Sequence, residues 1–269
     1  MGARNPAAPA RAFVPALGSV ELGEPFYPDQ LSESRDVTRE HVHVLEHELR
    51  TEQRTKFAAQ MADIVRDGII DPDTIRRLGD DRGAIALRAR VPRPGNVRLG
   101  DFGEIVASEF VRVALGAAVS YRLRGKVNVN MAMHGVDCIG VRLVNGRPIF
   151  YKGESKVRTR LGGDALRKAL SALEADDGLI RAEDLVLLID EQRRAGNVEL
   201  EQAVADELVT HARHLTRHVI FTIYASATKN GVADFIVTLR NENRTYLTTL
   251  KIGELSTFID DVYAMLVNR

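Results

Sequence analysis

Tryptophan is absent from this 269-residue chain, cysteine occurs once, and aromatic residues make up only 6% of the sequence. A single cysteine, Cys138, excludes an internal disulfide and a zinc site built from several cysteines, and it is typical of a reducing compartment. The scarcity of aromatic rings argues against stacking on such rings as the main means of binding a ligand.

Long apolar runs are also missing. Nowhere do about 18 apolar residues follow one another, so no membrane-spanning helix is expected. Pro6, Pro9 and Pro15 interrupt the N-terminal segment, where a secretory signal would need a continuous apolar stretch. Because 45% of the residues are apolar and 28% are charged, the balance is that of a globular domain, and we expect a cytoplasmic protein that does not enter a membrane.

The net charge is zero, but the charges are segregated along the chain. Residues 121–168 contain eleven Lys/Arg and three acids, a net charge of +8, whereas residues 169–210 contain three Arg and eleven acids, a net charge of −8. A basic block is typical of a surface that binds a polyanion, although solvated strands and loops also produce basic runs. The acidic block would be a partner surface or a mask over the basic one.

The apolar pattern divides the chain into three predicted parts. Residues 1–36 are rich in Pro, Ala and Gly and predict an irregular arm. Residues 37–98 predict a helical lead-in that begins near Thr38 and ends its first helix near Asp67. Its apolar stripe consists of Phe57, Met61, Ile64 and Val65. Residues 99–269 form the predicted main domain.

The main domain opens with a helix and a strand meander. Residues 105–115 predict a mostly buried helix, which Asp101 and Glu104 precede and Gly116 ends. The three strand-like segments that follow are residues 119–129, 136–144 and 147–157. Asn145-Gly146 separates the last two, which is a strong signal for a tight hairpin.

The remainder of the domain alternates helices and strands. A helix capped by Asp164 is expected over residues 164–174, and an acidic helix-rich stretch follows over residues 183–217. The later predicted elements are strands over 219–225, 233–239 and 246–252 and a helix over 255–267. This order predicts an α/β fold with a mixed central sheet flanked by helices on both faces.

Charged side chains gather on the predicted hairpin. Because side chains alternate along a strand, Lys152, Glu154 and Lys156 share one face of the third segment. Asp137 lies across the hairpin, at the start of an otherwise apolar strand. Placing such charges in a hairpin is costly unless they pair with one another or bind a metal.

This set of residues suits phosphodiester hydrolysis. Two neighbouring carboxylates hold Mg²⁺ through oxygen ligands and leave positions for water and phosphate. A nearby ammonium orients the water or stabilises the developing charge. Asp137 and Glu154 are the predicted metal ligands, helped by the Ser155 carbonyl, and Lys156 is the predicted catalytic ammonium; Mn²⁺ is an alternative metal. The alternative reading is a surface hairpin in which Glu154 merely pairs with a lysine.

The same residues resemble the PD-(D/E)xK nuclease core. That core places an acid on one strand of a hairpin and E-x-K on its partner, which matches Asp137 and Glu154-Ser155-Lys156. The resemblance implies a restriction-endonuclease-like core, and it adds Glu104 on the preceding helix as a further catalytic and metal-binding residue. The family's leading proline is replaced here by Val136. Asp101 and Glu104 also fit a capping box, so Glu104 is predicted as either a helix cap or a ligand.

A narrower resemblance rests on three phrases, Gly-Asp-Phe-Gly-Glu104, His134-Gly-Val-Asp137 and Lys152-Gly-Glu-Ser-Lys156. They are similar to the HamA-like nuclease subunits of Hachiman antiphage defence systems. This resemblance implies a separate helicase partner, an ATPase, and destruction of DNA during infection. The chain itself contains no Gly-rich phosphate loop.

Several basic residues are predicted to contact the DNA backbone. They are Lys152, Arg158, Arg160, Lys168 and His134. The other histidines include two pairs at i, i+4 spacing, His43/His47 and His214/His218, for which a zinc site is a weak alternative because no third ligand lies nearby. Cys138 is expected in the core.

Two other functions stay open at this point. The chain can be a restriction- or repair-type endonuclease with its own sequence preference, or a non-catalytic nucleic-acid-binding subunit of a defence complex.

Overall fold

The computed structural model describes residues 26–39, 42–133, 135–210, 215–228, 232, 235 and 245–267. Most of the predicted N-terminal arm and most of the predicted strand over residues 233–239 lie outside this part of the chain. The same holds for His134 and for His214.

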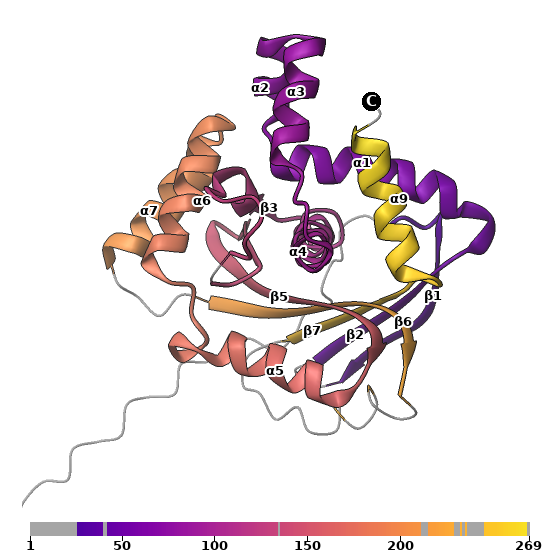
Figure 1. The fold of residues 1–269 in the computed structure, drawn as a ribbon. Helices are drawn as coiled ribbons and strands as arrows, with labels where there is room; N and C mark the ends of the chain where they lie inside the picture. Colours follow the sequence, from indigo (N-terminus) through magenta and orange to yellow (C-terminus); the bar gives the residue numbers. More distant parts are fainter. Residues whose placement is uncertain are drawn as a thin grey trace, which may run out of the picture.

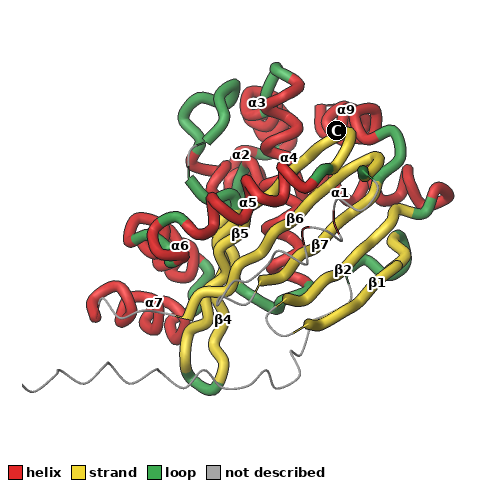
Figure 2. The backbone as a smooth tube through the Cα atoms, turned by 90° about the horizontal axis from the view of Figure 1, so that it is seen from below, coloured by secondary structure: helices red, strands yellow, loops and turns green. Residues whose placement is uncertain are grey.

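The described residues form seven strands in one mixed sheet (Figures 1 and 2). The strands are β1 (Leu31–Arg39), β2 (Val42–Leu49), β3 (Ala118–Ser120), β4 (Cys138–Val144), β5 (Arg147–Leu161), β6 (Leu215–Ala227) and β7 (Thr245–Lys251). Their order across the sheet is β1-β2-β7-β6-β5-β4-β3. The four central strands run parallel, and antiparallel partners flank them on both sides. The predicted α/β architecture with a mixed sheet is confirmed.

Helices cover both faces of this sheet. They are α1 (Arg54–Ile69), α2 (Pro72–Leu78), α3 (Asp80–Arg90), α4 (Gly95–Val113), α5 (Gly163–Glu174), α6 (Ala182–Arg194), α7 (Val198–Thr210) and α9 (Leu255–Val267). Figure 1 shows α4, α1 and α9 on one side of the sheet, α5 on the other, and the α2–α3 hairpin projecting at the top. Short 3-10 turns are η1 (Thr51–Gln53), η2 (Arg122–Gly125) and η3 (Asp176–Gly178).

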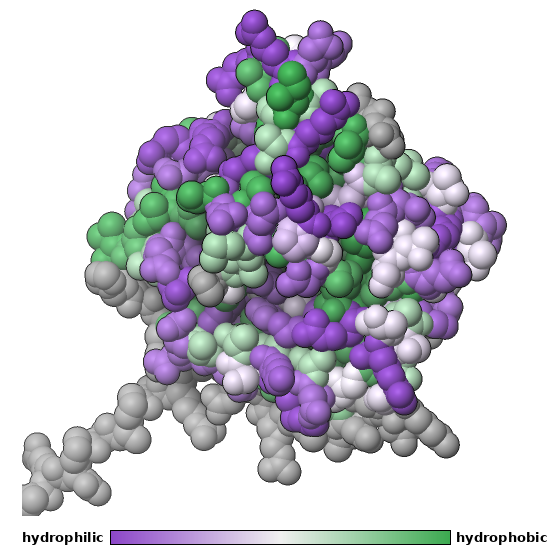
Figure 3. Space-filling view, viewed as in Figure 1, coloured by the Kyte–Doolittle hydropathy of each residue, from purple (hydrophilic) through white to green (hydrophobic). Residues whose placement is uncertain are grey.

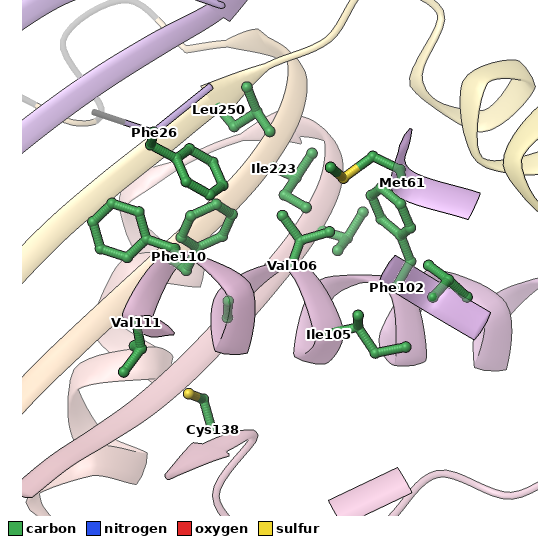
Figure 4. Packing of buried hydrophobic residues seen from close by; sticks show 14 of the residues in the cluster. Phe26, Met61, Phe102, Ile105, Val106, Phe110, Val111, Cys138, Ile223 and Leu250 are labelled. Atoms are coloured by element: carbon green, nitrogen blue, oxygen red, sulfur yellow. The ribbon is translucent and has the colours of Figure 1, made fainter. Parts of the chain in front are cut away.

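Helix α4 lies in the centre of the largest apolar cluster. Apolar residues on nearly every side of the helix are buried, which is the pattern of a core helix. Figure 4 shows Val106 and Phe110 of α4 on the side of the helix that faces Ile223 and Leu250 of the sheet, and Phe102 beside Met61 of α1. The polar residues of α4, including Glu104, are therefore held by a helix that is fixed in the core.

The β4–β5 hairpin forms as its turn sequence predicts. Asn145 and Gly146 have φ angles of 53° and 73°, and positive φ at both central residues is the conformation that a two-residue hairpin favours. The ladder runs from Val144↔Arg147 to Cys138↔Gly153. Strand β5 then continues to Leu161 with β6 as its ladder partner, and no described strand pairs with the other edge of its second half, which we call the open edge.

The helical prediction near Thr38 is wrong at its start. Residues 31–39 and 42–49 form the antiparallel pair β1–β2, and β2 pairs in parallel with β7. Burial along β2 alternates for most of its length, with Val42 and Val44 packed on one face. The pairing joins residues about 200 positions apart, such as His43↔Tyr246, so no local sequence pattern predicts it. The sheet is therefore not confined to residues 99–269.

The strand predicted over residues 119–129 is also wrong for most of its length. Only Ala118–Ser120 is a strand, and η2 follows it. Arg90 of α3 donates hydrogen bonds to the carbonyls of Leu123, Arg124 and Lys126, which holds this segment in a turn. Two smaller corrections concern α5, whose N-cap residue is Gly162 rather than Asp164, and residues 215–217, which begin β6.

Other predicted elements are confirmed. The buried helix of the main domain, the helix over 255–267 and the strand over 246–252 are present as α4, α9 and β7. Phe57, Met61 and Val65 are buried on α1. In the described residues, no helix has the length and apolar character needed to cross a bilayer.

Candidate active site at the open edge of strand β5

A cleft of about 520 Å³ lies where the second half of β5 faces α4 and the segment that follows η2. Its lining combines acids, cations and apolar groups. The residues that matter below are Asp101, Glu104, Asn130, Met131, Asp137, Ser155, Lys156 and Arg158.

Asp137 is placed by the end of the β4–β5 ladder. Cys138↔Gly153 is the last pair; Asp137 directly precedes β4, and Glu154 follows Gly153 on β5. The Asp137 amide donates to the Gly153 carbonyl, and its Oδ2 accepts bonds from the Ser155 amide (2.8 Å) and hydroxyl (2.9 Å). The predicted hairpin thus brings Asp137 beside the Glu154-Ser155-Lys156 segment.

Glu154 and Lys156 form an ion pair on β5. Glu154 is only 9% exposed, and burial together with the nearby Asp137 charge raises its pKa to about 7, while Lys156 opposes the shift. The ammonium and the carboxylate therefore share one face of the strand, as alternation predicts. The cleft lining includes Lys156 but not Glu154, whose carboxylate is engaged by the lysine.

Glu104 is not a helix cap. Helix α4 begins at Gly95, so Glu104 lies more than two turns inside it, and the capping-box prediction is wrong. The side chain lines the cleft, the residue is 8% exposed, and its buried Oε1 accepts no hydrogen bond from the described residues. Burial and the Asp137 charge raise the pKa of Glu104 well above its usual range.

The donor set fits a hard divalent cation. A buried carboxylate oxygen without a donor, beside a second carboxylate, is stabilised by a metal ion that takes oxygen ligands. The N–H and C=O of a strand residue point to the same side, so the Ser155 carbonyl faces the open edge along with its amide. Within the described residues, however, no three His, Cys, Asp or Glu side chains already stand in a group that would hold a metal.

A further buried ion pair adjoins this site. Lys126 donates to both oxygens of Asp101 at 2.7 Å, and both side chains are nearly inaccessible. Asp101 lies one turn before Glu104 on α4, and burial raises its pKa against the pull of Lys126. Sequence reasoning missed Lys126, because its partner Asp101 lies 25 residues away along the chain.

The predicted DNA-contacting residues separate into two groups. Arg158 lines the cleft, and Arg160 and Lys168 are exposed on β5 and α5. Lys152 is contradicted as a phosphate contact: it is 1% exposed, and its Nζ donates to the Ala175 carbonyl at 2.7 Å. Burial lowers its pKa. The predicted contact of His134 lies outside the described residues.

Neither the described histidines of the two pairs nor the cysteine lines the cleft. His43 and His47 lie on strand β2, where residues four apart are separated by roughly 13 Å, so they do not form a helical chelating pair. His218 is buried, and its Nε2 lies 3.0 Å from the Gly178 carbonyl oxygen. Cys138 is in the core as predicted, and burial raises the pKa of its thiol to about 12.

Two comparisons bear on the identity of the chain. No curated protein matches it. A family model for HamA matches residues 24–267, which covers the whole sheet and every cleft residue named above. The match agrees with the resemblance carried by the three sequence phrases, and it connects the chain with Hachiman-type antiphage defence. The chain therefore belongs to the HamA family.

Proposed function

We propose that this chain is a metal-dependent DNA nuclease with a PD-(D/E)xK-type site, acting in Hachiman-type defence beside a separate helicase. The observation that carries the proposal is that Asp137 lies beside Ser155 and near both Glu104 and Glu154, with Lys156 paired to Glu154, at the open edge of β5. Asp137 raises the pKa of both Glu104 and Glu154, and such repulsion between buried carboxylates is costly in a fold unless they serve a charged ligand.

The order of elements supports the PD-(D/E)xK assignment. An acid precedes one hairpin strand, E-x-K lies on its partner, and a glutamate comes from the helix before them, as in the family pattern. The helicase partner and the choice of DNA rest on the family resemblance alone, and the cytoplasmic location stays a prediction.

Each residue has a chemical task in this proposal. Glu104, Asp137, Glu154 and the Ser155 carbonyl would hold Mg²⁺ or Mn²⁺, which supplies charge neutralisation and a water of lowered pKa. The Lys156 ammonium orients the attacking water and stabilises charge that develops on the phosphate. Arg158, at the cleft, and the exposed Arg160 and Lys168 attract the phosphate backbone. For Glu154 to serve as a metal ligand, its carboxylate would have to leave its ion pair with Lys156.

Replacing Glu154 tests the proposal. Glu154→Ala is expected to abolish Mg²⁺-dependent cleavage of DNA, measured on the full chain alone and together with its helicase partner. Glu174→Ala, which removes an exposed glutamate on α5, is the matched control and should cleave at the native rate. Circular dichroism of both variants shows whether the fold is kept. Undiminished cleavage by a folded Glu154→Ala variant would falsify the assignment.

A second candidate is a non-catalytic nucleic-acid-binding subunit. The Glu154–Lys156 ion pair and the absence of a preassembled three-residue metal group in the described residues favour it. Titration with Mg²⁺ and Mn²⁺ separates the two, because such a subunit would show no metal-dependent cleavage in any assembly. If cleavage is seen, sequencing of the cut ends distinguishes a general nuclease from a restriction- or repair-type enzyme with a fixed site.

A further inference from the structure

The segment between η2 and Asp137 differs from everything around it in charge. Residues 127–133 read Val-Asn-Val-Asn-Met-Ala-Met and carry no charge, although they lie inside the block with a net charge of +8. Two of their apolar side chains are presented to solvent: Val127 is 100% exposed and Met131 is 58% exposed. Contact with phosphate would call for cations here, so this segment suits another part of a ligand.

The exposed position is held by the rest of the fold. At the start of the segment, Lys126 is fixed by its bonds to Asp101 and by the bond from Arg90 to its carbonyl (2.7 Å). In the middle, the Arg93 amide donates to Asn130 Oδ1 at 2.9 Å. The Asn130 amide in turn donates to the side chain of Asn128. These bonds anchor the segment at Lys126 and Asn130, while the side chains of Val127 and Met131 remain exposed.

The position of the segment in the cleft indicates which kind of ligand it fits. Asn130, Met131 and Met133 line the same cleft as Lys156 and Arg158, so one cavity has a cationic wall and an apolar, amide-bearing rim. A nucleic acid strand has the complementary division, with charged phosphates on one side and bases on the other. The flat face of a base accepts an apolar side chain such as methionine, and its edge accepts an amide.

We propose that the part of this segment that lines the cleft, residues 130–133, contacts nucleobases, with Met131 packed on the face of an unstacked base beside the phosphate to be cleaved. This inference rests on the proposed nuclease function and deepens it by naming the form of the substrate. A duplex buries the faces of its bases by stacking, so the site takes single-stranded or frayed DNA in preference to a closed duplex.

The test compares two labelled oligonucleotides that share all their phosphates. One is an ordinary single strand, and in the other the bases are removed to leave abasic sugars. Affinities for the full-length chain are measured by fluorescence anisotropy with Ca²⁺ in place of Mg²⁺. The native chain is expected to bind the ordinary strand roughly tenfold more tightly, as burial of one methionine on a base implies.

Variants assign that discrimination to the segment. Met131→Ser is expected to lose most of the tenfold ratio while its affinity for the abasic strand is unchanged, and Met131→Leu is expected to restore it. Ile85→Ser is the matched control, because Ile85 is 65% exposed on α3, away from the cleft lining, and its variant should keep the native ratio. Cleavage of the single strand relative to the closed duplex is measured on the same variants, and Met131→Ser should lower the native preference.

Two results would overturn the inference. A native chain that cleaves DNA but binds both strands equally has no base contact. A Met131→Ser variant with the native ratio assigns the contact elsewhere, as expected if Met131 serves a protein partner. A chain that neither binds nor cleaves DNA in any assembly contradicts the proposed function itself, which separates the two failures.

Discussion

Strand β5 passes through two different environments. From Ile149 to Gly153 it lies between β4 and β6, and from Glu154 to Leu161 β6 alone is its ladder partner among the described strands. Lys152 and Lys156 make the difference visible, because each lies two residues from Glu154 on the same face. Lys152 is buried against the Ala175 carbonyl, whereas Lys156 reaches the cleft and pairs with Glu154.

The comparison shows that a side chain's role on a strand depends on where the neighbouring strand ends. In the closed half, the backbone groups of β5 are used by two ladders, and side chains are enclosed. In the open half, the Ser155 amide is free to bind the Asp137 carboxylate, and the cleft forms beside it. Chemistry is therefore expected only beyond the last β4–β5 pair.

Replacing Lys152 or Lys156 with alanine should give the largest contrast between a loss of stability and a loss of activity. Lys156→Ala is expected to lower the cleavage rate by about 10²–10⁴-fold, since the group acts on the reacting phosphate, and to cost less stability than Lys152→Ala, because the buried Glu154, with its raised pKa, takes up a proton when its partner is removed. Lys152→Ala is expected to lower the free energy of unfolding by about 2–4 kcal/mol, because it leaves a cavity and a buried carbonyl without its donor. Denaturant unfolding and cleavage kinetics measure both. If both variants lost activity equally and neither lost stability, the distinction between the closed and open halves of β5 would be wrong.

Two glycines of α4 provide a smaller contrast. A Cβ on Gly103 would lie 2.6 Å from Val157 Cγ2 and 3.0 Å from Ser155 Oγ, whereas a Cβ on Gly95 meets nothing within 4 Å. Gly103→Ala is therefore expected to push α4 away from the open half of β5 and to cost about 1–3 kcal/mol. Gly95→Ala should change the stability by less than about 1 kcal/mol. Unfolding in urea tests both, and a native-like Gly103→Ala would show that α4 does not approach β5 this closely.

The smallest expected effect is a dependence of stability on pH. In the metal-free chain, folding raises the pKa of Glu154 to about 7, so between its ordinary value near 4.3 and about 7 the folded state holds a proton that the unfolded state has released. Stability contributed by this group is thus present at low pH and falls as the pH rises through that window.

The variant Glu154→Gln removes this contribution. Its stability relative to the native chain should increase from about pH 5 to about pH 8, as measured by denaturant unfolding in the presence of a chelator. Glu174→Gln, on the exposed face of α5, should leave the native pH profile in place. Parallel profiles for native and Glu154→Gln chains would show that the carboxylate is already ionised at low pH.

Local signals predicted the parts of the site that local chemistry determines. Asn145-Gly146 set the hairpin, and alternation then placed Glu154 and Lys156 on one face beside Asp137. The open edge was not predictable, because it arises from the unequal lengths of β4 and β5. The burial of Lys152 was missed because its partner is a backbone carbonyl, which has no sequence signature.

The edge pair β1–β2 and the capping alternative for Glu104 were misjudged for a related reason. Strand β2 pairs with β7, about 200 residues later in the sequence, and this pairing overrides the local helical pattern. Glu104 was given a capping alternative because the start of α4 was placed near Asp101, whereas the helix extends back to Gly95. In both cases, the contacts that decide the structure come from residues distant in sequence.

The open edge of β5, which no strand of the described residues covers, also presents a risk of aggregation. Backbone amides and carbonyls along a free edge invite a strand from another molecule, which is a common route to aggregation. Charge opposes such strand addition here. Arg158 and Arg160 are exposed beside Lys156, and an added strand would have to desolvate these cations. The residues proposed to attract phosphate would thus also protect the chain from its own copies, and neutralising them should make the protein less soluble as well as less active.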